Sequence, residues 1–321
     1  MLQEQILSYL EKNKGQQVTG GELAREFQVS RTAVWKSIHA LCENGHRIQS
    51  FSKSGYVLLS ESDGLSKTSI QSNLTTKTFG QHLELLKTIP STNQYLKELA
   101  IHDLPEGYAV LANEQTQGRG RLNRTFHSPS NEGIYLSILV KPQIALSETP
   151  FLTICTAVAV SQAIEKICGF TAGIKWVNDL YYDNKKLCGI LTEGFVSAEL
   201  QIIDYAIVGI GINTGHVVPE VQDIATSIYD VTHILGIRNQ LIAEILNQFE
   251  KIYVQFTQQD KKQDILQEYV DKLFIMNRKI QVITSDKPYE AIVTGVDISG
   301  ALIVRNIAGE TIHINSGSIN L

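Results

Sequence analysis

Residues 115–124 have the sequence QTQGRGRLNR, which crowds three arginines onto a segment with glycines at alternate positions. Residues 115–131 contain no Asp or Glu, so this segment is positively charged, although the whole chain has a formal net charge of −5. Glycine lets a backbone approach a ligand closely, and guanidinium groups match the geometry of carboxylate and phosphate oxygens. The segment therefore predicts an anion-binding loop. A solvated basic loop or a basic patch that touches RNA is the alternative.

The composition around this segment is that of an ordinary soluble globular protein. The chain has 321 residues, enough for two or three domains, and is 43% hydrophobic and 19% charged. Its four cysteines form no Cys-x-x-Cys pair, which favours thiols in a reduced, cytoplasmic protein. The most apolar run, residues 151–164, contains several polar residues and is predicted to be too short and too polar to span a bilayer. We expect no secretory signal, because the first residues lack a basic region followed by an apolar one.

Residues 1–62 are predicted to form a small helical domain that ends in a hairpin. Leucine and isoleucine at helical spacing indicate a first helix near residues 2–10, and a capping box at residues 19–22 indicates a second. Ser30 is a suitable N-cap for a third helix over residues 31–43. Two helices joined by a short turn are typical of the helix-turn-helix, whose second helix lies in the major groove of DNA.

The third helix carries the predicted DNA contacts. Val34, Ile38 and Leu41 are expected to face the core, which leaves an exposed tryptophan on the opposite face. Strands over residues 47–51 and 56–59 are predicted to form a wing. The net charge of residues 1–60 is only +2, so DNA binding should be salt-sensitive and should need two copies. A winged helix used only for protein contacts is the alternative. The predicted DNA-binding residues are Ser30, Arg31, Thr32, Trp35, Lys36, His39 and Lys53.

Beyond a polar boundary at residues 60–66 the sequence pattern becomes mixed. Strands are expected over residues 82–89, 109–112, 134–140, 173–176, 180–182, 186–191 and 202–212, and helices after residue 91 and over residues 150–167, 241–256 and 265–273. Residues 63–276 therefore predict a mixed β-sheet with flanking helices. Residues 277–321 contain short β-rich runs separated by turns, which is typical of a small β-barrel. The expected fold class is α+β, in three domains.

Further polar clusters lie in the central domain at predicted strand ends and turns. Residues 91–94 (STNQ) form a second predicted capping box, residues 175–179 (KWVND) combine a cation with a carboxylate, and residues 185–189 (KKLCG) place an ammonium beside a glycine. Taken singly, each has a structural explanation as a helix cap, a surface ion pair or a solvated lysine pair. Residues 209–213 (GIGIN) resemble a dinucleotide fingerprint only superficially, because the third glycine and the following helix are missing.

Together these clusters match the needs of an enzyme that makes an adenylate. Arg119, Arg121, Lys175 and Lys186 supply positive charge for phosphate and carboxylate groups, and Asp179 supplies a possible metal ligand. No pairing of a nucleophile with a base is evident. An enzyme that joins a carboxylate to the α-phosphate of ATP needs none, because the substrate carboxylate attacks and catalysis rests on positioning and charge stabilisation.

Four motifs in this order, behind a winged helix, resemble those of bifunctional biotin protein ligases that are also biotin operon repressors. The motifs are GRGRLNR at residues 118–124, KWVND at 175–179, KLCG at 186–189 and GIGIN at 209–213. The resemblance covers essentially the whole chain, and the short ligases of the same family lack the winged helix. It implies a class II synthetase-like ligase domain and an SH3-like C-terminal barrel.

The same resemblance implies two activities. The enzyme would form biotinyl-5′-AMP from biotin and ATP with Mg²⁺, and transfer biotin to a lysine of the biotin carboxyl carrier protein of acetyl-CoA carboxylase. A ligand-promoted homodimer would bind operator DNA and repress the genes of biotin synthesis and transport, with biotinyl-5′-AMP as corepressor. Two other functions remain open from the residues: a metabolite-sensing repressor without ligase activity, and a lipoate or other acyl ligase of the same broad fold.

Roles for individual residues also follow from the resemblance. Lys186, Arg119 and Arg121 would be catalytic by stabilising charge on the acyl phosphate, and Asp179 would place Mg²⁺. The implied biotin-binding residues are Ser91, Thr92, Asn93, Gln115, Gly118, Arg119, Gly120, Arg121, Lys186 and Gly189. The implied ATP- and adenylate-binding residues are Arg121, Arg124, Phe126, Lys175, Asn178, Asp179 and Asn213.

Two residues depart from the family pattern. Val177 stands where a proline is usual, so the turn that carries Asn178 and Asp179 is less fixed. Phe126 stands where a tryptophan often stacks on adenine, and phenylalanine can stack but cannot donate a hydrogen bond. Residues 115–124 have few apolar groups, so we expect this loop to be disordered without ligand and to complete a dimer surface once the adenylate orders it.

Overall fold

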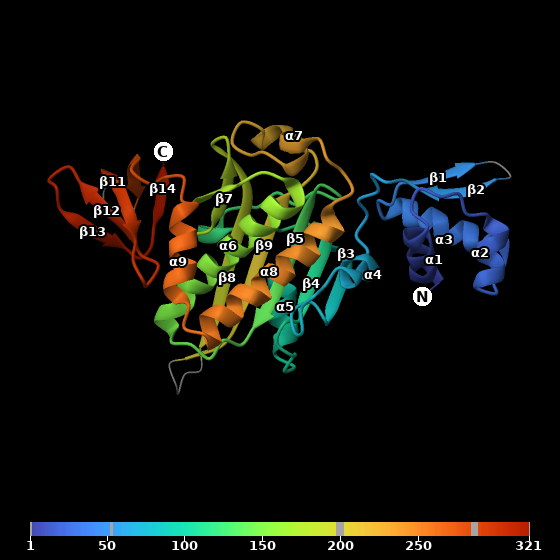
Figure 1. The fold of residues 1–321 in the computed structure, drawn as a ribbon, viewed down its shortest axis with the longest axis horizontal. Coiled ribbons are helices and arrows are strands. Elements are labelled where there is room, and N and C mark those ends of the chain that lie inside the picture. Colours follow the sequence, from blue (N-terminus) through green and yellow to red (C-terminus); the bar gives the residue numbers. More distant parts are fainter. Residues whose placement is uncertain (1, 52–53, 197–201, 284–287, 321) are drawn as a thin grey trace.

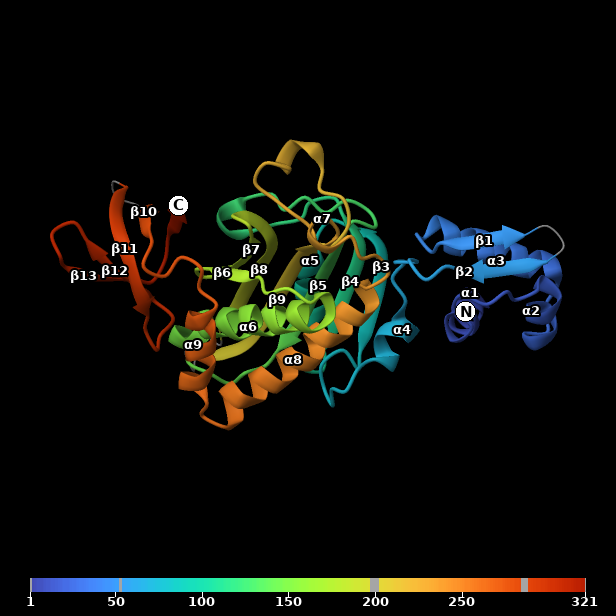
Figure 2. The same cartoon turned by 45° about the horizontal axis from the view of Figure 1, so that its top comes forward.

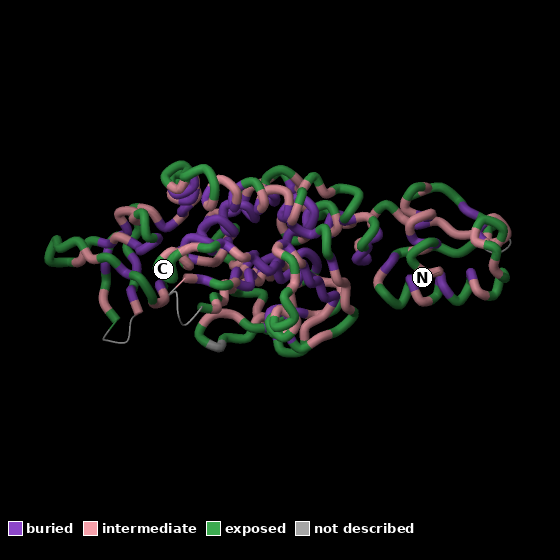
Figure 3. The backbone as a smooth tube through the Cα atoms, turned by 90° about the horizontal axis from the view of Figure 1, so that it is seen from below, coloured by how far each residue is buried: buried purple, intermediate pink, exposed green. Residues whose placement is uncertain are grey.

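The computed structural model describes residues 2–51, 54–196, 202–283 and 288–320. Figure 1 shows three bodies along the long axis of the molecule: a small helical body with a two-stranded hairpin, a large central sheet with helices, and a small all-β body. Figure 2 shows the same order from a second direction. Buried residues are most concentrated in the central body, as the purple segments of Figure 3 show.

The N-terminal body is a winged helix with its own core. Its elements are α1 (Leu2–Lys12), α2 (Gly20–Glu26), α3 (Arg31–Glu43), β1 (Ile48–Phe51) and β2 (Gly55–Leu58). Thr19 and Glu22 form the predicted reciprocal capping box, and the Ser30 hydroxyl accepts the backbone N–H of Ala33 at the predicted start of α3. Val34, Ile38 and Leu41 are buried. The helix starts and the buried stripe predicted from the sequence are confirmed.

The central body contains a seven-stranded sheet in the order β3-β4-β5-β9-β8-β7-β6. Its strands are β3 (Leu83–Ile89), β4 (Ala109–Gln115), β5 (Gly133–Val140), β6 (Gly173–Lys175), β7 (Asp179–Tyr182), β8 (Lys185–Val196) and β9 (Ile203–Asn213). β3 pairs parallel with β4, and the other neighbouring strands pair antiparallel. The predicted mixed sheet is confirmed, although β4 and β8 are longer than expected and β9 is shifted by one residue.

Helices cover the two faces of this sheet unequally. α6 (Thr149–Cys168), α8 (Arg238–Gln258) and α9 (Lys262–Asp271) share the main core with one face. α5 (Thr92–Ala100) packs on the other face, where Leu96 meets Val110, Leu139 and Ile207. Because side chains alternate along a strand, residues of β9 that share parity with Ile207 also point toward the α5 side. That side carries the site described below.

The most apolar helix is a core element. Residues Leu146–Cys168 are long and apolar enough, by length and composition, to cross a membrane. Of the apolar 18-residue stretch within them, 78% is buried inside the protein. The prediction from the sequence that this run is too short and too polar to span a bilayer was therefore wrong about both its length and its composition. α6 lies beside α8 against the sheet (Figure 2), and the burial of its residues in the main core accounts for its apolar composition.

The C-terminal body is a five-stranded sheet in the order β13-β12-β11-β10-β14. Its strands are β10 (Lys279–Ile283), β11 (Tyr289–Val296), β12 (Leu302–Asn306), β13 (Thr311–Ile314) and β14 (Ser318–Asn320). The first four were predicted and β14 was not. β13 and β14 form the two edges, and no pairing between them is present in the described residues, so the expected barrel is not closed.

Short elements escaped the sequence analysis. The helices α4 (Lys67–Ser72) and α7 (Ile228–Thr232) were not predicted, because each has too few residues to show a periodic pattern. The predicted capping box at the start of α5 is half formed. The Ser91 hydroxyl accepts the backbone N–H of Gln94, but the Gln94 side chain donates to Glu98 instead of returning to the cap.

Candidate functional site

A cleft of about 350 Å³ lies on the α5 side of the central sheet. β4, β8 and β9 contribute to it, and residues 317–320 of the C-terminal body close one side. It brings together all the biotin- and ATP-binding residues predicted from the sequence except Gly118. The predicted residues that line the cleft are Ser91, Thr92, Asn93, Gln115, Arg119, Gly120, Arg121, Arg124, Phe126, Lys175, Asn178, Asp179, Lys186, Gly189 and Asn213.

Glycines form the floor of the cleft, and their lack of side chains lets Asn93 and Phe126 lie directly on the sheet. A Cβ added at Gly209 would lie 2.3 Å from Asn93 Oδ1, and one at Gly211 would lie 2.6 Å from the Phe126 ring. Gly211 pairs with Gly189 across β9 and β8, and Phe126 extends over both. Residues 209–213 thus belong to a strand and form no dinucleotide loop, which confirms the sequence analysis.

A hydrogen-bond network fixes the start of α5 beside the floor. The backbone N–H and the hydroxyl of Thr92 both donate to Gln115 Oε1, at 2.9 and 3.1 Å. Ser137 Oγ lies 2.7 Å from Thr92 Oγ1 and 2.6 Å from Asn93 Oδ1. Asn93 Nδ2 donates to Glu193 Oε2 at 2.7 Å. These contacts hold Thr92 and Gln115 in one arrangement, and they engage both ends of the Asn93 amide with the protein.

Sequence reasoning missed Ser137 and Glu193. Ser137 is fully buried, and its signal was visible: it is the one polar side chain, apart from a tyrosine, in the apolar strand 134–140. A hydroxyl in such a run needs a buried partner, which Thr92 and Asn93 supply here. Glu193 gave no comparable signal, because β8 continues five residues beyond the strand end that the sequence predicted.

The arginine-rich segment folds back on itself over the cleft. The Gly120 N–H donates to Arg124 O at 2.7 Å, and the Phe126 N–H donates to Gly118 O at 2.9 Å. A Cβ at Gly118 would lie 2.3 Å from Phe126 O, so this glycine allows the segment to close and does not itself line the cleft. Arg121 Nη1 donates to Asn178 Oδ1 at 3.1 Å. The expected ordering of this loop by ligand stays a prediction.

Cations gather at the other end of the cleft around Asp179. Lys186 Nζ lies 2.8 Å from Asp179 Oδ1, which also accepts a hydrogen bond from Asn178 Nδ2. Burial lowers the pKa of Lys175; Asp179 opposes this shift, and Lys186 reinforces it. The Lys175 ammonium lies 5.1 Å from the centre of the Tyr181 ring, and burial raises the pKa of Tyr181 to about 12. Tyr181 was not predicted as a site residue.

Asp179 is the predicted ligand for Mg²⁺. Across residues 2–51, 54–196, 202–283 and 288–320, no three His, Cys, Asp or Glu side chains gather closely enough to hold a metal ion. A single carboxylate holds Mg²⁺ when phosphate oxygens and waters complete the coordination. The donors present therefore suit a metal that arrives with a triphosphate, and they do not form a resident metal centre.

Contacts from two other elements hold the turn at Val177. The peptide bond between Trp176 and Val177 is cis. Tyr269 from α9 donates its hydroxyl to Val177 O at 3.0 Å, and Trp176 Nε1 donates to Gly300 O at 3.0 Å. The Gly300 contact joins the turn to the C-terminal body. The turn therefore has support from packing in place of the proline that the family pattern usually supplies.

The predicted DNA-binding face of α3 is solvent-accessible. Arg31, Thr32, Trp35, Lys36 and His39 are all exposed, with Trp35 at 56%. The Trp35 and His39 rings lie 5.6 Å apart, and His39 also contacts Glu43. This arrangement fits the exposed aromatic and polar face expected from the sequence. Lys53, predicted at the tip of the wing, lies outside the described residues.

Comparison with known proteins gives three family matches. Residues 85–213 match the biotin/lipoate A/B protein ligase family, residues 2–57 an HTH domain, and residues 275–321 the biotin protein ligase C-terminal domain. The fold and the cleft thus define a protein ligase of the biotin/lipoate class with a helix-turn-helix head.

Individual relatives narrow this class. The chain is 37% identical over 256 residues to the bifunctional ligase/repressor BirA of Bacillus subtilis, a match that covers 78% of each chain. It is 28% identical over 292 residues to BirA of Escherichia coli, covering 89% of this chain and 88% of the other. The biotin protein ligase of Aquifex aeolicus, solved with biotin and ATP, superposes with a TM-score of 0.65 at 28% identity, over 75% of this chain and 98% of the other. The chain belongs to the family of bifunctional biotin protein ligases and repressors.

Proposed function

We infer that this chain is an ATP-dependent biotin protein ligase that also represses transcription by binding DNA. Its family membership supports this inference, and so does one observation on the site. A single cleft joins a fixed hydrogen-bonding end, at Thr92 and Gln115, to a cationic end, at Arg119, Arg121 and Lys186. A polar ring system followed by a carboxylate and a phosphate needs this sequence of groups.

The first step joins biotin to AMP. The biotin carboxylate attacks the α-phosphate of ATP, and pyrophosphate leaves, which gives biotinyl-5′-AMP. In this proposal Thr92 and Gln115 bind the polar ring of biotin. Arg119 and Arg121 close over its carboxylate and the phosphate, and Lys186 stabilises the negative charge that develops there. Asp179 would place the Mg²⁺ that arrives with the triphosphate, and this ion would supply further charge neutralisation.

The nucleotide would occupy the part of the cleft beside the glycine floor. Phe126 provides an aromatic face for adenine, and Asn178 and Asn213 provide amides for the adenosine part. Asn213 Nδ2 donates to Thr226 O at 3.0 Å, which leaves its carbonyl oxygen to accept from the ligand. Arg124 and Lys175 add positive charge for the phosphates.

The second step transfers biotin to a protein. The ε-amine of a lysine in a biotin carboxyl carrier protein attacks the carbonyl carbon of the mixed anhydride, and AMP leaves. Residues 317–320, in and before β14, line the cleft, and this supports a role for the C-terminal body in holding ATP and the carrier. The proposed carrier is that of acetyl-CoA carboxylase.

Repression rests on the exposed face of α3 and on a homodimer. Two winged helices related by a two-fold axis would meet two half-sites of an operator, with biotinyl-5′-AMP as corepressor. The arginine-rich loop would complete the dimer surface when the adenylate orders it. We place the protein in the cytoplasm, because all four cysteines are free thiols and the proposed operator DNA lies in that compartment.

Biotin-dependent exchange of pyrophosphate into ATP tests this function. The purified protein with ATP and Mg²⁺ should exchange pyrophosphate when biotin is added, and it should not respond to lipoate. A response to lipoate alone would indicate a lipoate ligase. The absence of exchange with either acid would indicate a metabolite sensor that lacks ligase activity.

A further inference from the structure

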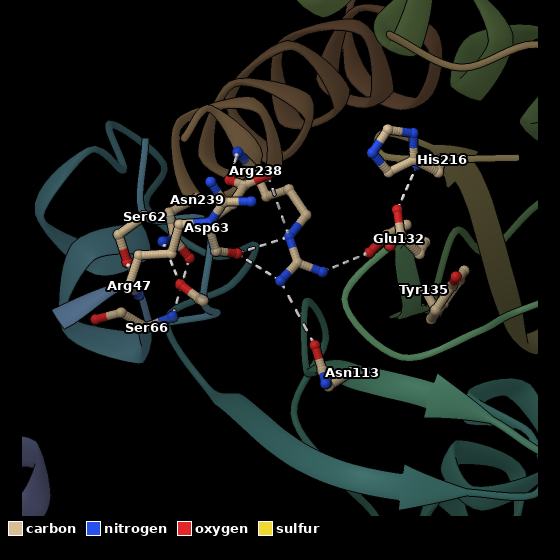
Figure 4. A network of polar contacts seen from close by, with 12 residues as sticks. Arg47, Ser62, Asp63, Ser66, Asn113, Glu132, Tyr135, His216, Arg238 and Asn239 are labelled. Atoms are coloured by element: carbon tan, nitrogen blue, oxygen red, sulfur yellow. Dashed lines mark hydrogen bonds and ion pairs between the residues drawn. The ribbon is translucent and has the colours of Figure 1, made fainter. Parts of the chain in front are cut away.

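A buried arginine fixes the linker between the winged helix and the central body. Arg238 stands at the start of α8 and is fully buried. Its Nε donates to the backbone oxygen of Asp63 at 2.8 Å, Nη2 donates to the same oxygen, and its backbone N–H donates to Asp63 Oδ1 at 2.8 Å. Figure 4 shows these contacts converging on the linker. The side chain of Arg238 thus holds the main chain of Asp63, and its backbone N–H holds the Asp63 carboxylate, so the linker is fixed at Asp63.

The same guanidinium group reaches the segment that follows Phe126. Arg238 Nη1 donates to Gly133 O at 3.0 Å, and Nη2 lies 3.5 Å from Asn113 Oδ1 (Figure 4). Asn113 Nδ2 in turn donates to Ser130 Oγ at 2.8 Å, and Asn113 O accepts the N–H of Asn131 at 3.3 Å. Residues 130–133 are therefore tied to Asp63 through Arg238 and Asn113.

The start of this segment belongs to the ligand site. Ser128 is held by Gln115, through a side-chain hydrogen bond of 3.0 Å and a main-chain hydrogen bond of 3.0 Å, and Phe126 lies on the glycine floor two residues earlier. The ring that stacks on adenine in the proposed function adjusts to the ligand by rotating its side chain or by shifting its backbone. A backbone shift at Phe126 would reach Ser130 and Asn131, four and five residues further along the chain, once it also moves Ser128.

Asn131 also touches the winged helix directly. Gly45 follows the C-cap of α3 with φ +89°, and a Cβ added there would lie 2.1 Å from Asn131 Oδ1. This oxygen is buried and has no hydrogen-bond donor among the described residues. Buried carbonyl oxygens are nearly always satisfied, so this contact is unfavourable for Asn131 as it stands. A small displacement of either partner would relieve it, which makes the contact sensitive to the position of the segment.

We propose that residues 126–133 couple the nucleotide site to the winged helix of the same protomer, through the Asn131–Gly45 contact and the Ser130–Asn113–Arg238–Asp63 hydrogen-bond chain. This proposal rests on the proposed function, because the adenylate is what moves Phe126. Filling the site changes how the DNA-binding domain is held before any second copy of the chain is engaged. When ligand-promoted dimerisation follows, the winged helix of each protomer already has the orientation that DNA binding needs.

The distance between the two bodies within one molecule tests the coupling. Spin labels are placed at Glu26→Cys on α2 and Lys251→Cys on α8, two exposed positions, in a chain whose exposed Cys42 is replaced by Ser. Labelled protein is diluted with unlabelled protein so that only intramolecular distances are read. Asn131→Gly removes the contact with Gly45 and suits the positive φ of 66° at this position. Asn113→Ala removes the link to Arg238, and Asn277→Gly is a matched control at φ 60° far from the winged helix.

In the parent protein, biotin, ATP and Mg²⁺ should shift the distance distribution. Asn131→Gly and Asn113→Ala should each lose at least half of that shift, while Asn277→Gly keeps it and all three variants form adenylate at the parental yield. A parent distribution that does not change although adenylate forms would overturn the coupling, and so would variants that respond as the parent does. If no adenylate formed in the parent, the proposed function itself would fail and the inference with it.

Discussion

Lys186 Nζ and Asp179 Oδ1 lie 2.8 Å apart at the cationic end of the cleft, so the proposed catalytic lysine is paired with the proposed Mg²⁺-placing carboxylate. Each side chain is partly exposed, at 33% and 22%, and the pair can therefore exchange partners without a large change in burial. Mg²⁺ and the triphosphate would take the carboxylate, and the released ammonium would turn to the acyl phosphate. The ion pair thus keeps both side chains charged and inside the cleft until the substrates bind.

Replacement of Lys186 by Ala should lower the rate of adenylate formation about 10²–10³-fold, the effect usual for loss of one group that stabilises charge in a transition state. Single-turnover quenching with saturating biotin and ATP measures this rate. Lys185→Ala is the matched control, because the neighbouring lysine is exposed and donates to Gln222 O away from Asp179. An unchanged rate in Lys186→Ala would remove this residue from the mechanism.

Arg119→Gly should let the adenylate escape before transfer. Arg119 lines the cleft on the segment that closes over it, and loss of its guanidinium group removes a partner for the carboxylate and phosphate oxygens. The variant should attach biotin to lysines of unrelated proteins, as detected by streptavidin blotting, at least tenfold more than wild type. Arg305→Gly, an exposed arginine on β12, should behave as wild type. Retention of a tightly bound intermediate by Arg119→Gly would contradict its role.

Gly211→Ala should weaken the use of ATP more than the use of biotin. The added methyl group would lie 2.6 Å from the Phe126 ring and force it off the floor. We expect the KM for ATP to rise about tenfold, which corresponds to ~1.4 kcal/mol. Gly295→Ala, on β11, is the control, because its nearest neighbour would be at 3.7 Å. Equal KM values for ATP in the two variants would show that Phe126 does not contact the nucleotide.

His46 should make the folded state less stable below about pH 6.5. Burial, reinforced by the charges of Arg238 and Lys14, lowers the pKa of this histidine from 6.5 to about 4. Between pH 6.5 and pH 4 the histidine is protonated in the unfolded chain and neutral in the folded chain. The free energy of unfolding is therefore unaffected by His46 above pH 6.5 and falls by ~1.4 kcal/mol for each pH unit toward pH 4. His46→Gln should abolish this component. Urea unfolding at pH 7.5 and pH 5.0 measures it, and equal pH dependence in both proteins would refute the assignment.

Leu122→Asp should weaken dimerisation in the presence of biotin and ATP by at least tenfold. Leu122 is 72% exposed on the loop that closes over the cleft, so a charge there would be buried unpaired if the loop forms the dimer surface. Ile101→Asp, at a residue that is 78% exposed after α5, is the control. Sedimentation equilibrium with and without ligands gives both constants. A normal ligand-promoted dimer of Leu122→Asp would place the interface elsewhere.

The parts of the fold that could be predicted are those whose structure depends on residues close together in the sequence. Thr19, Ser30 and Glu22 mark helix starts through their own side chains, and the buried stripe of α3 follows from its spacing. The clustering of the site could also be anticipated, because the arginine loop, Lys186 and Asp179 each stand beside turns of a sheet. Motif order supplied the roles that spacing alone left open.

What the sequence could not supply depends on contacts between distant residues. The position of Ser137 opposite Thr92, the pairing of β14 with β10, and the burial of Arg238 against Asp63 join residues that are 45 to 175 positions apart or belong to short strands. Arg238 in particular lies before the helix that the sequence predicted over residues 241–256, and no pattern indicated its burial. Its role depends on three carbonyl or amide oxygens that only the folded chain brings together.

The most direct test is to incubate the purified chain with biotin, ATP and Mg²⁺, denature it, and identify the small molecules that are released by mass spectrometry. We predict about one equivalent of biotinyl-5′-AMP per cleft, formed only when both substrates are present. Recovery of unreacted biotin and ATP alone would contradict the account, because the cations around Lys186 would then bind the substrates without promoting formation of biotinyl-5′-AMP.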